Sequence, residues 1–483
     1  ECKASPDPEG ARRRHPVLDN PEVVAYGRIP DLPLARYNGR DTLTTTYLRK
    51  YERARLKTDR DGVFETTYKE HIGPLTEVLA YMERTGMRAE KQHARDLQAY
   101  FGRRISELEA QLAEWAPINW GSGAQIAEFL YEDMGLPIPW KTESGKPSTD
   151  KYALSKLKDI HPVPDLILQR RRLATLSTTY AWGIERFIQA DGRVHTSFKA
   201  HGSETGRPTS SRPNQQNTPK GKDPDGKRIK DLYLASKGRR LVVFDHKTLE
   251  VRLAAGLSND ARMLEVIRSG IDFHLAAAKL IARLFGLDPA DITKDHWLRD
   301  TAKTLVFALL YGKSDNTAAD DLDVEVAIAA GVRAGILGEF VRLAGWIDET
   351  HAEVRRDGGV WTLRGDGKPT RFRPLPAIYS RSKKEVAYAL RAAVNTKVQG
   401  GGANVNNEGL IACYQWLMKT NMHKHVSMPL AVHDMICFDA DVAAVDDVLD
   451  VVPMLMCSFD YGVPLGVDAS VGERLGSCES VKL

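Results

Sequence analysis

Apolar residues recur at helical spacing over much of the chain. One stripe consists of Leu97, Phe101, Ile105, Leu108, Leu112 and Trp115. Because steps of three and four keep side chains on one face, this stripe predicts an amphipathic helix that ends before Pro117. Helical patterns also dominate residues 261–357. Residues 1–36 are instead rich in Pro, Asp and Arg and lack a period, so we expect a linker or the edge of a domain there.

Two other regions have the pattern of strands that end in polar residues. Residues 241–244, Leu-Val-Val-Phe, predict a buried strand that delivers Asp245 at its end. Farther on, the apolar runs 430–432 and 436–438 flank a His433-Asp434 pair. This interruption predicts a tight hairpin with the polar pair at its turn.

Composition describes an ordinary folded protein. The 483 residues are 42% apolar and 27% charged, which is globular usage, and at roughly 150 residues per domain the length suggests about three domains. The formal net charge is only +4, so a site for polyanions requires local clusters of cations such as the basic, Gly- and Pro-rich residues 201–240.

The five cysteines are scattered and never spaced as Cys-x-x-Cys, which favours neither a disulfide framework nor a zinc site. No segment has the apolar run of a signal peptide or membrane helix, so we expect a cytoplasmic protein without membrane contact.

One helical segment places two cations above two aromatic rings. Its face consists of Arg299, Lys303, Phe307 and Tyr311. Steps of four drift only about 40° around a helix, so the four side chains share one face. Such a face suits a triphosphate on the cations and a base on the rings. Taken alone, it is equally an amphipathic helix whose cations extend over core aromatics.

Three further segments are weak signals when each is taken alone. Asp245, with Glu250 at the start of the next helix, has the pattern of an ordinary turn or cap. The His433-Asp434 pair has the pattern of a buried, hydrogen-bonded turn. Arg391, Asn395 and Gln399 share a helix face whose donors suit phosphate oxygens or base edges, but which is also an ordinary polar face.

Read in chain order, these segments resemble the family A DNA polymerases, the bacterial polymerase I type. The resemblance also uses a Thr-Gly-Arg loop at residues 205–207 and the Asn- and Gln-rich residues 213–217. In that family the other segments correspond to motif A (Asp-x-x-x-x-Glu), motif B (Arg-x-x-x-Lys-x-x-x-Phe-x-x-x-Tyr-Gly), an Arg/Asn/Gln helix and motif C (His-Asp). Weaker likeness extends to Asn119-x-x-Ser122-x-x-Gln125 upstream and Val463-Pro464-Leu465 downstream.

The resemblance implies an α+β fold shaped like a right hand. The expected parts are a helical thumb at 71–190, a palm built on an antiparallel sheet at 191–261 and 370–483, and helical fingers at 262–369. Residues 1–70 would be an N-terminal segment, the remnant edge of an exonuclease-like domain.

The activity implied is that of a template-directed DNA polymerase that adds dNTPs to a primer 3′ end by two-metal-ion nucleotidyl transfer. The catalytic residues implied are Asp245, Asp434 and Lys303. Two Mg²⁺ ions, for which Mn²⁺ is a substitute, would bind Asp245, Asp434 and the backbone carbonyl of His246. The partners implied are primer-template DNA and dNTPs, and we expect a monomer.

The resemblance also assigns the substrate contacts. The residues implied to bind the dNTP are Arg299, Lys303, Phe307, Tyr311, Glu250 and His274. Those implied to bind DNA are Arg207, Asn214, Gln216, Asn217, Arg391, Asn395, Gln399 and His433. Glu250 against Tyr311 resembles the family's steric gate, which excludes a 2′-hydroxyl and so selects dNTPs over NTPs.

The sequence departs from the family pattern at three positions. Met435 stands where a Glu usually follows the motif C Asp, which removes a carboxylate beside the metal ligands. Asp300 replaces a frequent second Arg of motif B. Position 307 is Phe rather than Tyr, which by resemblance predicts discrimination against dideoxynucleotides.

Two further expectations concern the N-terminus and the activity itself. Tyr37-x-x-x-Asp41 resembles the last motif of the family's proofreading exonuclease, whereas Asp7-Pro8-Glu9 is a false match to its first, because no apolar strand surrounds it. We therefore expect no 3′ to 5′ exonuclease activity in this chain. The rivals are a catalytically silent, polymerase-like DNA-binding accessory protein, which intact Asp245, Asp434 and Lys303 argue against, and a single-subunit RNA polymerase, which Glu250 argues against.

Overall fold

The computed structural model describes residues 31–58, 62–219, 223–310, 314–322 and 324–483, and the chain divides into two units, Glu1–Tyr68 and Lys69–Leu483. The first unit contains helices α1 (Asp31–Thr58) and α2 (Val63–Thr67). The expectation of a linker through residue 36 is therefore wrong for its last residues, since α1 begins at Asp31. Pro33 is compatible with this start because a helix tolerates proline in its first turn.

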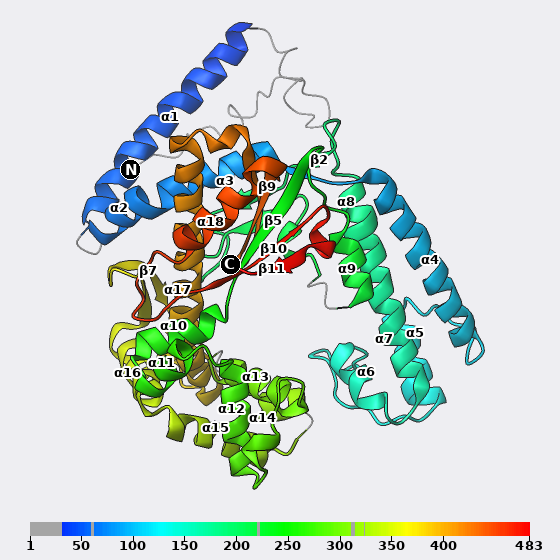
Figure 1. Cartoon of the computed structure of the whole chain (residues 1–483). Coiled ribbons are helices and arrows are strands. Elements are labelled where there is room, and N and C mark those ends of the chain that lie inside the picture. The colour runs from blue at the N-terminus through cyan, green and yellow to red at the C-terminus, as the bar shows by residue number, and fades with distance from the viewer. Residues whose placement is uncertain (1–30, 59–61, 220–222, 311–313, 323) are drawn as a thin grey trace, which may run out of the picture. The chain divides into compact units, whose positions relative to one another are not determined.

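A five-stranded antiparallel sheet lies at the centre of the second unit (Figure 1). Its strand order is β11-β10-β5-β9-β8. The strands are β5 (Arg239–His246), β8 (Val426–Val432), β9 (Met435–Asp441), β10 (Val467–Gly472) and β11 (Glu479–Val481). The predicted strand at 241–244 and the predicted hairpin at 430–438 are both confirmed as parts of this sheet.

The two faces of the sheet are packed differently. Because side chains alternate along a strand, Val242 and Phe244 of β5 lie on one face, in a core shared with α3 (Gly73–Thr85), α17 (Lys383–Lys419) and α18 (Val445–Met456). Leu241 and Val243 lie on the other face, in a core shared with α4 (Lys91–Ala113). Asp245 follows Val243 on this second face, at the end of the strand.

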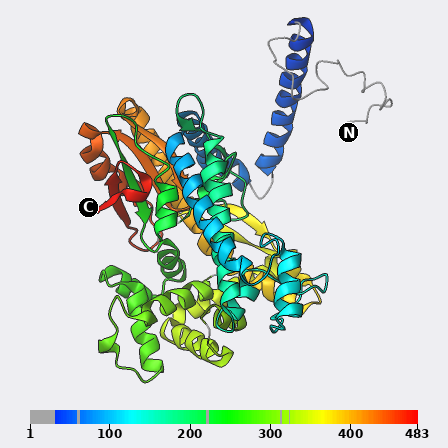
Figure 2. The ribbon, with the colours of Figure 1, turned by 90° about the vertical axis from the view of Figure 1, so that its right-hand side faces the viewer.

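The region before the sheet is mostly helical. Besides α4 it contains α5 (Gly123–Glu128), α6 (Lys151–Leu157), α7 (Pro162–Thr175), α8 (Gly183–Glu185) and α9 (Pro224–Lys230). Figures 1 and 2 show α4 and α7 side by side, as their contacts require. The predicted amphipathic helix ends before Pro117 as expected, but Trp115 lies beyond its last turn with 47% of its surface exposed and stacks edge-on against His161. Trp115 is thus no part of the buried stripe, because the chain leaves the helix before it.

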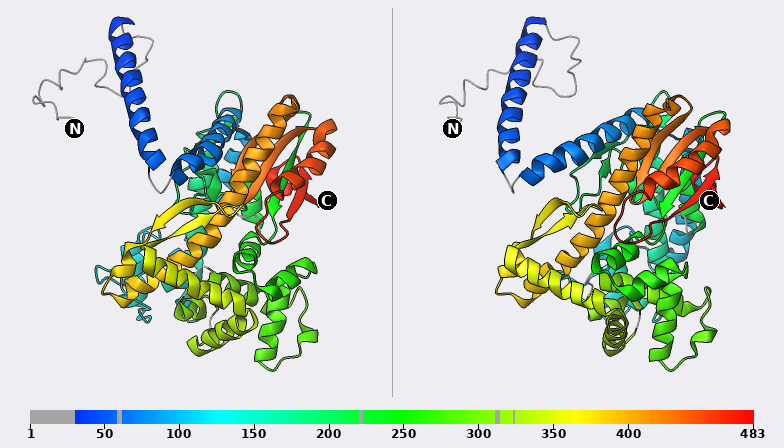
Figure 3. Two further views of the ribbon diagram at one scale, coloured as in Figure 1. Left: turned by 90° about the vertical axis from the view of Figure 1, so that its left-hand side faces the viewer. Right: turned by 60° about the vertical axis from the view of Figure 1, so that its left-hand side comes forward.

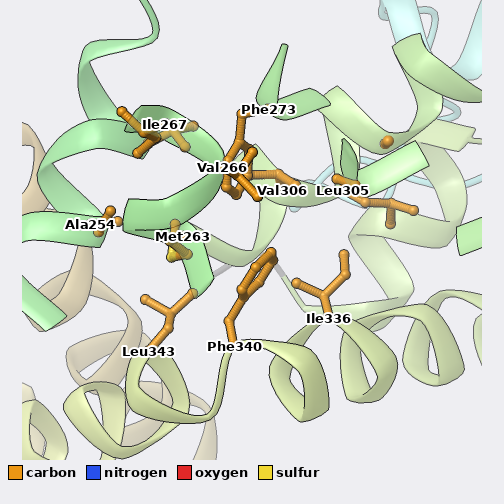
Figure 4. Packing of buried hydrophobic residues seen from close by; sticks show 14 of the residues in the cluster. Ala254, Met263, Val266, Ile267, Phe273, Leu305, Val306, Ile336, Phe340 and Leu343 are labelled. Atoms are coloured by element: carbon orange, nitrogen blue, oxygen red, sulfur yellow. The ribbon is translucent and has the colours of Figure 1, made fainter. Parts of the chain in front are cut away.

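A layer of helices follows the first strand of the sheet, β5, in the described part of the chain. Its helices are α10 (Leu249–Ser258), α11 (Ala261–Arg268), α12 (Phe273–Leu284), α13 (Trp297–Leu310), α14 (Asp315–Leu322) and α15 (Val326–Glu339), and α16 (Val341–Asp357) then completes the layer. Their shared core is built around Phe273 and Phe340, whose rings stack with centroids 5.6 Å apart (Figure 4). The predicted helical character of 261–357 is confirmed for the residues described.

One long helix joins the cores. Helix α17 contributes Val394 and Val398 to the core of α10–α16 and Leu410 and Leu417 to the core beneath the sheet. The hairpin of β6 (Gly359–Leu363) and β7 (Pro369–Pro374) lies beside it in both views of Figure 3. The remaining strands form two short pairs, β1 (Met87–Arg88) with β2 (Arg193–Val194) and β3 (Ser197–Lys199) with β4 (Thr209–Ser211).

The architecture agrees with the expected α+β class, with helical layers around an antiparallel sheet. The boundaries expected for thumb, palm and fingers stay predictions; the β6–β7 pair spans the expected limit between residues 369 and 370. Within the part of the chain that the structure describes, no helix is both long and apolar enough to cross a membrane.

Candidate active site at the end of the sheet

The sheet brings Asp245 and Asp434 together. Asp245 is paired in register with Met435, and the next residue, His246, donates its backbone N–H to the carbonyl of Asp434 at 3.4 Å. Val432 pairs with Met435, so His433 and Asp434 form a two-residue hairpin loop in which His433 adopts φ 58°. Asp434 immediately precedes Met435, the residue paired with Asp245, so the two aspartates occupy neighbouring positions at one end of the sheet.

The electrostatics of this pair favour a bound cation. Burial, together with the negative charges of Asp245 and Glu250, raises the pKa of Asp434 to about 7. A divalent ion between the carboxylates would offset both effects, since hard cations prefer oxygen ligands. Among the described residues no group of three or more His, Cys, Asp or Glu side chains could hold a metal ion. The donors available, two carboxylates and the nearby backbone carbonyls, therefore fit ions that take further oxygens from a bound substrate or water.

Glu250 faces this end of the sheet from the first turn of α10. Thr248, in the left-handed conformation (φ 45°), turns the chain sharply from the strand into the helix. The carboxylate of Glu250 accepts a hydrogen bond from the Arg207 guanidinium at 2.9 Å. These side chains are only 13% and 24% exposed, so the ion pair is more shielded from solvent than a surface pair.

The loop that carries Arg207 is held from two sides. Gly206 has φ +83°, which L side chains rarely adopt, and Arg371 lies 3.1 Å from the position that a Cβ would occupy there. The buried Asn407 of α17 donates to the Gly206 carbonyl at 3.2 Å, and the Ser203 hydroxyl donates to the Arg207 carbonyl at 2.8 Å. The Thr-Gly-Arg loop is thus fixed by contacts from β7, α17 and the loop itself.

Helices α12 and α13 face the sheet end across a cavity. Arg299 donates to Asp272 at 2.6 and 3.0 Å, and Asp272 also caps α12 by accepting from the N–H groups of His274 and Leu275. Although burial opposes it, these hydrogen bonds lower the pKa of Asp272 below its ordinary value. Burial lowers the pKa of His274 to about 4; the negative charge of Asp272 opposes this shift, and the positive charges of Lys303 and Arg299 contribute to it. His274 is therefore neutral at physiological pH.

The cavity between these elements has a volume of about 1,600 Å³. The predicted site residues that line it are Arg207, Gln216, Asn217, Asp245, His246, Glu250, His274, Arg299, Lys303, His433 and Asp434. We call Asp245, His246, His433, Asp434, Met435 and Asp468 its strand side, and Asp272, His274, Arg299 and Lys303 its helix side.

Other predicted site residues lie elsewhere. Arg391, Asn395 and Gln399 are half-buried on α17, as predicted on one helix, and do not line this cavity. The side-chain oxygen of Asn214 accepts hydrogen bonds from the Gln216 N–H and the Ser210 hydroxyl within its own loop. Tyr311 lies outside the described residues, and Phe307 lies in α13 with no described side chain.

Two of the residues that depart from the family pattern, Met435 and Asp300, have described side-chain environments. Met435 packs against the apolar core on its face of the sheet, next to Asp245 in register. The Asp300 side chain is 90% exposed and lies 3.9 Å from Arg299. Of the two residues that resemble an exonuclease motif, Asp41 is exposed on α1 and Tyr37 lies in α1 with no described side chain. The false match at Asp7 and Glu9 lies outside the described residues.

Asp272, Lys247 and Asp468 are polar lining residues of the cavity that sequence reasoning did not assign to the site. Asp272 holds Arg299, and Lys247 forms an ion pair with Asp468 at 2.9 Å. Lys247 lies inside motif A and Asp468 follows the Val463-Pro464-Leu465 segment, so both had a positional signal. Their pairing had none, because it depends on which strands are neighbours.

Comparisons with known proteins agree with this architecture. The fold is that of a polymerase domain: the POL domain of Pol1 from M. smegmatis, solved in complex with DNA primer-template and dNTP, superimposes with a TM-score of 0.78 at 27% identity, covering 85% of this chain and 71% of that chain. A model of DNA polymerase family A matches residues 91–477. The chain belongs to DNA polymerase family A.

Two named relatives give the extent of the likeness. The thermostable DNA polymerase I of Thermus aquaticus is 33% identical over 411 residues, which are 84% of this chain and 48% of that protein. The DNA polymerase I of Chloroflexus aurantiacus is 30% identical over 458 residues, 93% of this chain and 47% of that protein. The chain thus spans about half the length of these relatives.

Proposed function

We propose that this chain is a template-directed DNA polymerase that adds dNTPs to a primer 3′ end. The observation that carries the proposal is the cavity itself, in which Asp245 and Asp434 face Arg299 and Lys303. Carboxylates on one side and cations on the other suit a metal-bound triphosphate between them. The family membership and the relative solved with primer-template and dNTP support the same reading.

Two Mg²⁺ ions, with Mn²⁺ as a substitute, would be held by Asp245, Asp434 and the backbone carbonyl of His246. When bound, such ions activate a 3′ oxygen as nucleophile and neutralise a pyrophosphate leaving group. The pKa of Asp434, raised by burial and by the charges of Asp245 and Glu250, supports this assignment, because a bound cation would favour the ionised carboxylates.

The helix side would bind the triphosphate. Lys303 and Arg299 supply positive charge where negative charge grows on the phosphates, which makes Lys303 a catalytic as well as a binding residue. His274, neutral in the fold, donates a hydrogen bond rather than a charge. Because Asp272 already holds Arg299 at 2.6 Å, the triphosphate competes with that carboxylate for the guanidinium.

The sugar and base would be selected by Glu250, Phe307 and Tyr311. Glu250, with Arg207 fixing its carboxylate at 2.9 Å, excludes a 2′-hydroxyl by its bulk and charge. Phe307, which lacks a hydroxyl, leads us to expect discrimination against dideoxynucleotides. Both selections act on a nucleotide placed by the triphosphate contacts.

Primer-template DNA would lie across the palm. The residues proposed to hold it are Arg207, Asn214, Gln216, Asn217, Arg391, Asn395, Gln399 and His433. Side-chain donors of this kind read acceptors common to all base pairs in the minor groove, so binding is independent of sequence and weakens with salt. We expect no 3′ to 5′ removal of nucleotides by this chain.

The alternative is a silent, polymerase-like DNA-binding protein. Such a protein has no need to keep two mutually repelling carboxylates in one cavity with Lys303, and the cost of Asp434 burial argues against it.

Extension of a labelled primer on a template tests the proposal. The assay compares dNTPs with NTPs in the presence of Mg²⁺ for the wild-type protein and Asp434→Ala. We expect incorporation of dNTPs only, and its loss in the variant. Asp450→Ala, an exposed position on α18 outside the cavity, serves as the matched control. Extension by Asp434→Ala at the wild-type rate contradicts the proposal, and DNA binding without any extension by the wild type favours the silent protein.

A further inference from the structure

Lys247 brings a cation to the strand side of the cavity. It follows Asp245 by two positions, and its backbone N–H is fixed to the carbonyl of Gly466 at 2.8 Å. Its own carbonyl accepts from the guanidinium of Arg252 at 2.9 Å. The backbone is thus held on both sides, while the side chain is 45% exposed and lines the cavity.

The partner of Lys247 is set by the sheet register. Asp468 of β10 pairs directly with Asp245 of β5, just as Met435 of β9 pairs with Asp245 from the other side. Directly paired residues project from the same face of a sheet. Asp468 and Asp245 therefore leave the sheet side by side, and the Lys247 ammonium lies 2.9 Å from the Asp468 carboxylate.

This ion pair is one that a phosphate can displace. The Asp468 side chain is 73% exposed, and an ion pair in that setting contributes only about 0–1 kcal/mol. A lysine ammonium is a compact charge with three donors on a flexible stem, so it can leave a carboxylate for an anion of higher charge without backbone movement. Two other paired cations of the cavity, Arg207 and Arg299, are held by less exposed carboxylates.

We propose that Lys247 binds the polyphosphate of the substrate from the strand side, opposite Arg299 and Lys303, and that Asp468 is the residue that positions it. The ligand is the diphosphate portion shared by the incoming nucleotide and the pyrophosphate product. The proposal rests on the proposed function and extends it, because it gives the palm its own phosphate contact beside the metal ligands. It assigns a role to two residues that the motif pattern leaves open.

The first experiment compares Lys247→Ala, Lys247→Arg and the control Lys237→Ala, which changes an exposed lysine outside the cavity. Loss of a charge-assisted contact predicts an increase of about tenfold both in KM for dNTP and in the inhibition constant of inorganic pyrophosphate. We expect kcat and the affinity for primer-template to stay within about threefold, and Lys247→Arg to restore most of the loss. If the KM and the pyrophosphate constant of Lys247→Ala match those of the wild type, or if only primer-template affinity falls, the proposal is wrong.

A double-mutant cycle tests the part of Asp468. Asp468→Asn alone removes a carboxylate that competes with the phosphate for the lysine, so it is expected to lower KM by about threefold, and Lys247→Ala/Asp468→Asn is expected to match Lys247→Ala, because the carboxylate acts through the lysine. Additive effects of the two changes contradict a positioning role.

Direct binding separates this proposal from the proposed function. Calorimetric titration of wild type, Lys247→Ala and Lys237→Ala with pyrophosphate and Mg²⁺ needs no primer extension. Weaker binding by Lys247→Ala alone supports the contact even if the wild type extends no primer, which would overturn only the proposed function. Equal affinities of the three proteins for pyrophosphate overturn the contact.

Discussion

The two sides of the cavity are built in different ways. On the strand side, Asp245 and Asp434 are fixed by backbone hydrogen bonds between β5 and the β8–β9 hairpin, in a sheet buried on both faces. On the helix side, Arg299 and Lys303 lie on one helix, α13, and Arg299 is held by Asp272. A sheet constrains its members through many shared hydrogen bonds, whereas a helix can move as a body. The comparison suggests a rigid side for metal ligands and a movable side for the substrate.

The largest effects should separate the two sides by kinetic parameter. Asp434→Asn removes a charge from the proposed metal ligands, so we expect kcat to fall at least about 1,000-fold. Lys303→Ala removes a triphosphate contact that also stabilises the transition state, so KM for dNTP should rise about 10- to 100-fold and kcat should fall as well, though less than in Asp434→Asn. Steady-state primer extension over a dNTP series measures both. The comparison fails if Asp434→Asn changes only KM.

The layer of helices α10–α16 should also unfold separately from the sheet. The buried Asp260 accepts from the N–H groups of Arg262 and Met263 at the start of α11 with one oxygen, and from those of Arg342 and Leu343 at the start of α16 with the other. Asp260→Ala leaves these donors without their acceptor, and we expect a loss of about 3 kcal/mol in the free energy of unfolding.

Urea denaturation measures that loss, and hydrogen exchange locates it. Amides of α11 and α16 should exchange faster in Asp260→Ala, while those of β5 and β9 keep their protection. Asp260→Asn, which retains one acceptor oxygen, should lose about half as much stability. Uniform loss of protection in the sheet and the helices would show that the two sides unfold as one unit.

The stability of α17, the helix that joins the two cores, should depend on pH. Burial raises the pKa of Glu408, in the middle of α17, to about 7, with Arg364 opposing and Asp366 adding to the rise. Since the fold binds this proton more tightly than the unfolded chain, Glu408 stabilises the fold at low pH, and this contribution is lost as pH rises from about 4.5 through about 7. The change should reach about 2 kcal/mol.

Thermal unfolding of wild type and Glu408→Gln between pH 5 and 8 isolates this effect. The Tm of the wild type relative to the variant should fall as pH rises, because Gln has no proton to lose. His71 titrates in the opposite sense, since burial lowers its pKa to about 4, but it is common to both proteins and cancels in the difference. A constant difference in Tm across the range contradicts the prediction.

The smallest effect is expected where the strand side departs from the family pattern. Met435→Glu adds a carboxylate beside Asp245, which should lower the Mg²⁺ concentration for half-maximal extension about threefold, since negative charge attracts the ions. Primer extension by both proteins over a series of Mg²⁺ concentrations supplies the measurement. Identical curves would mean that the missing carboxylate does not limit the reaction.

The amino-acid sequence determined the local elements and the identity of the groups that carry the chemistry. Runs of apolar residues predicted the strand before Asp245 and the hairpin around Asp434, and helical spacing predicted the helix of Arg299 and Lys303, because such local elements depend on residues close in the chain. Trp115 and the start of α1 were mispredicted, since a pattern of apolar residues does not show where a helix ends or begins without a core.

The tertiary structure alone decided which of these groups meet. Strand order places Asp468 next to Asp245, where it forms an ion pair with Lys247. Helix packing brings Arg299 within hydrogen-bond distance of Asp272. Neither contact has a sequence signal, because hydrogen bonds between strands and packing between helices join residues far apart in the chain. The physical reason is that local propensity acts over a few residues, whereas the site is made by burial of two faces of one sheet and of the helices around it.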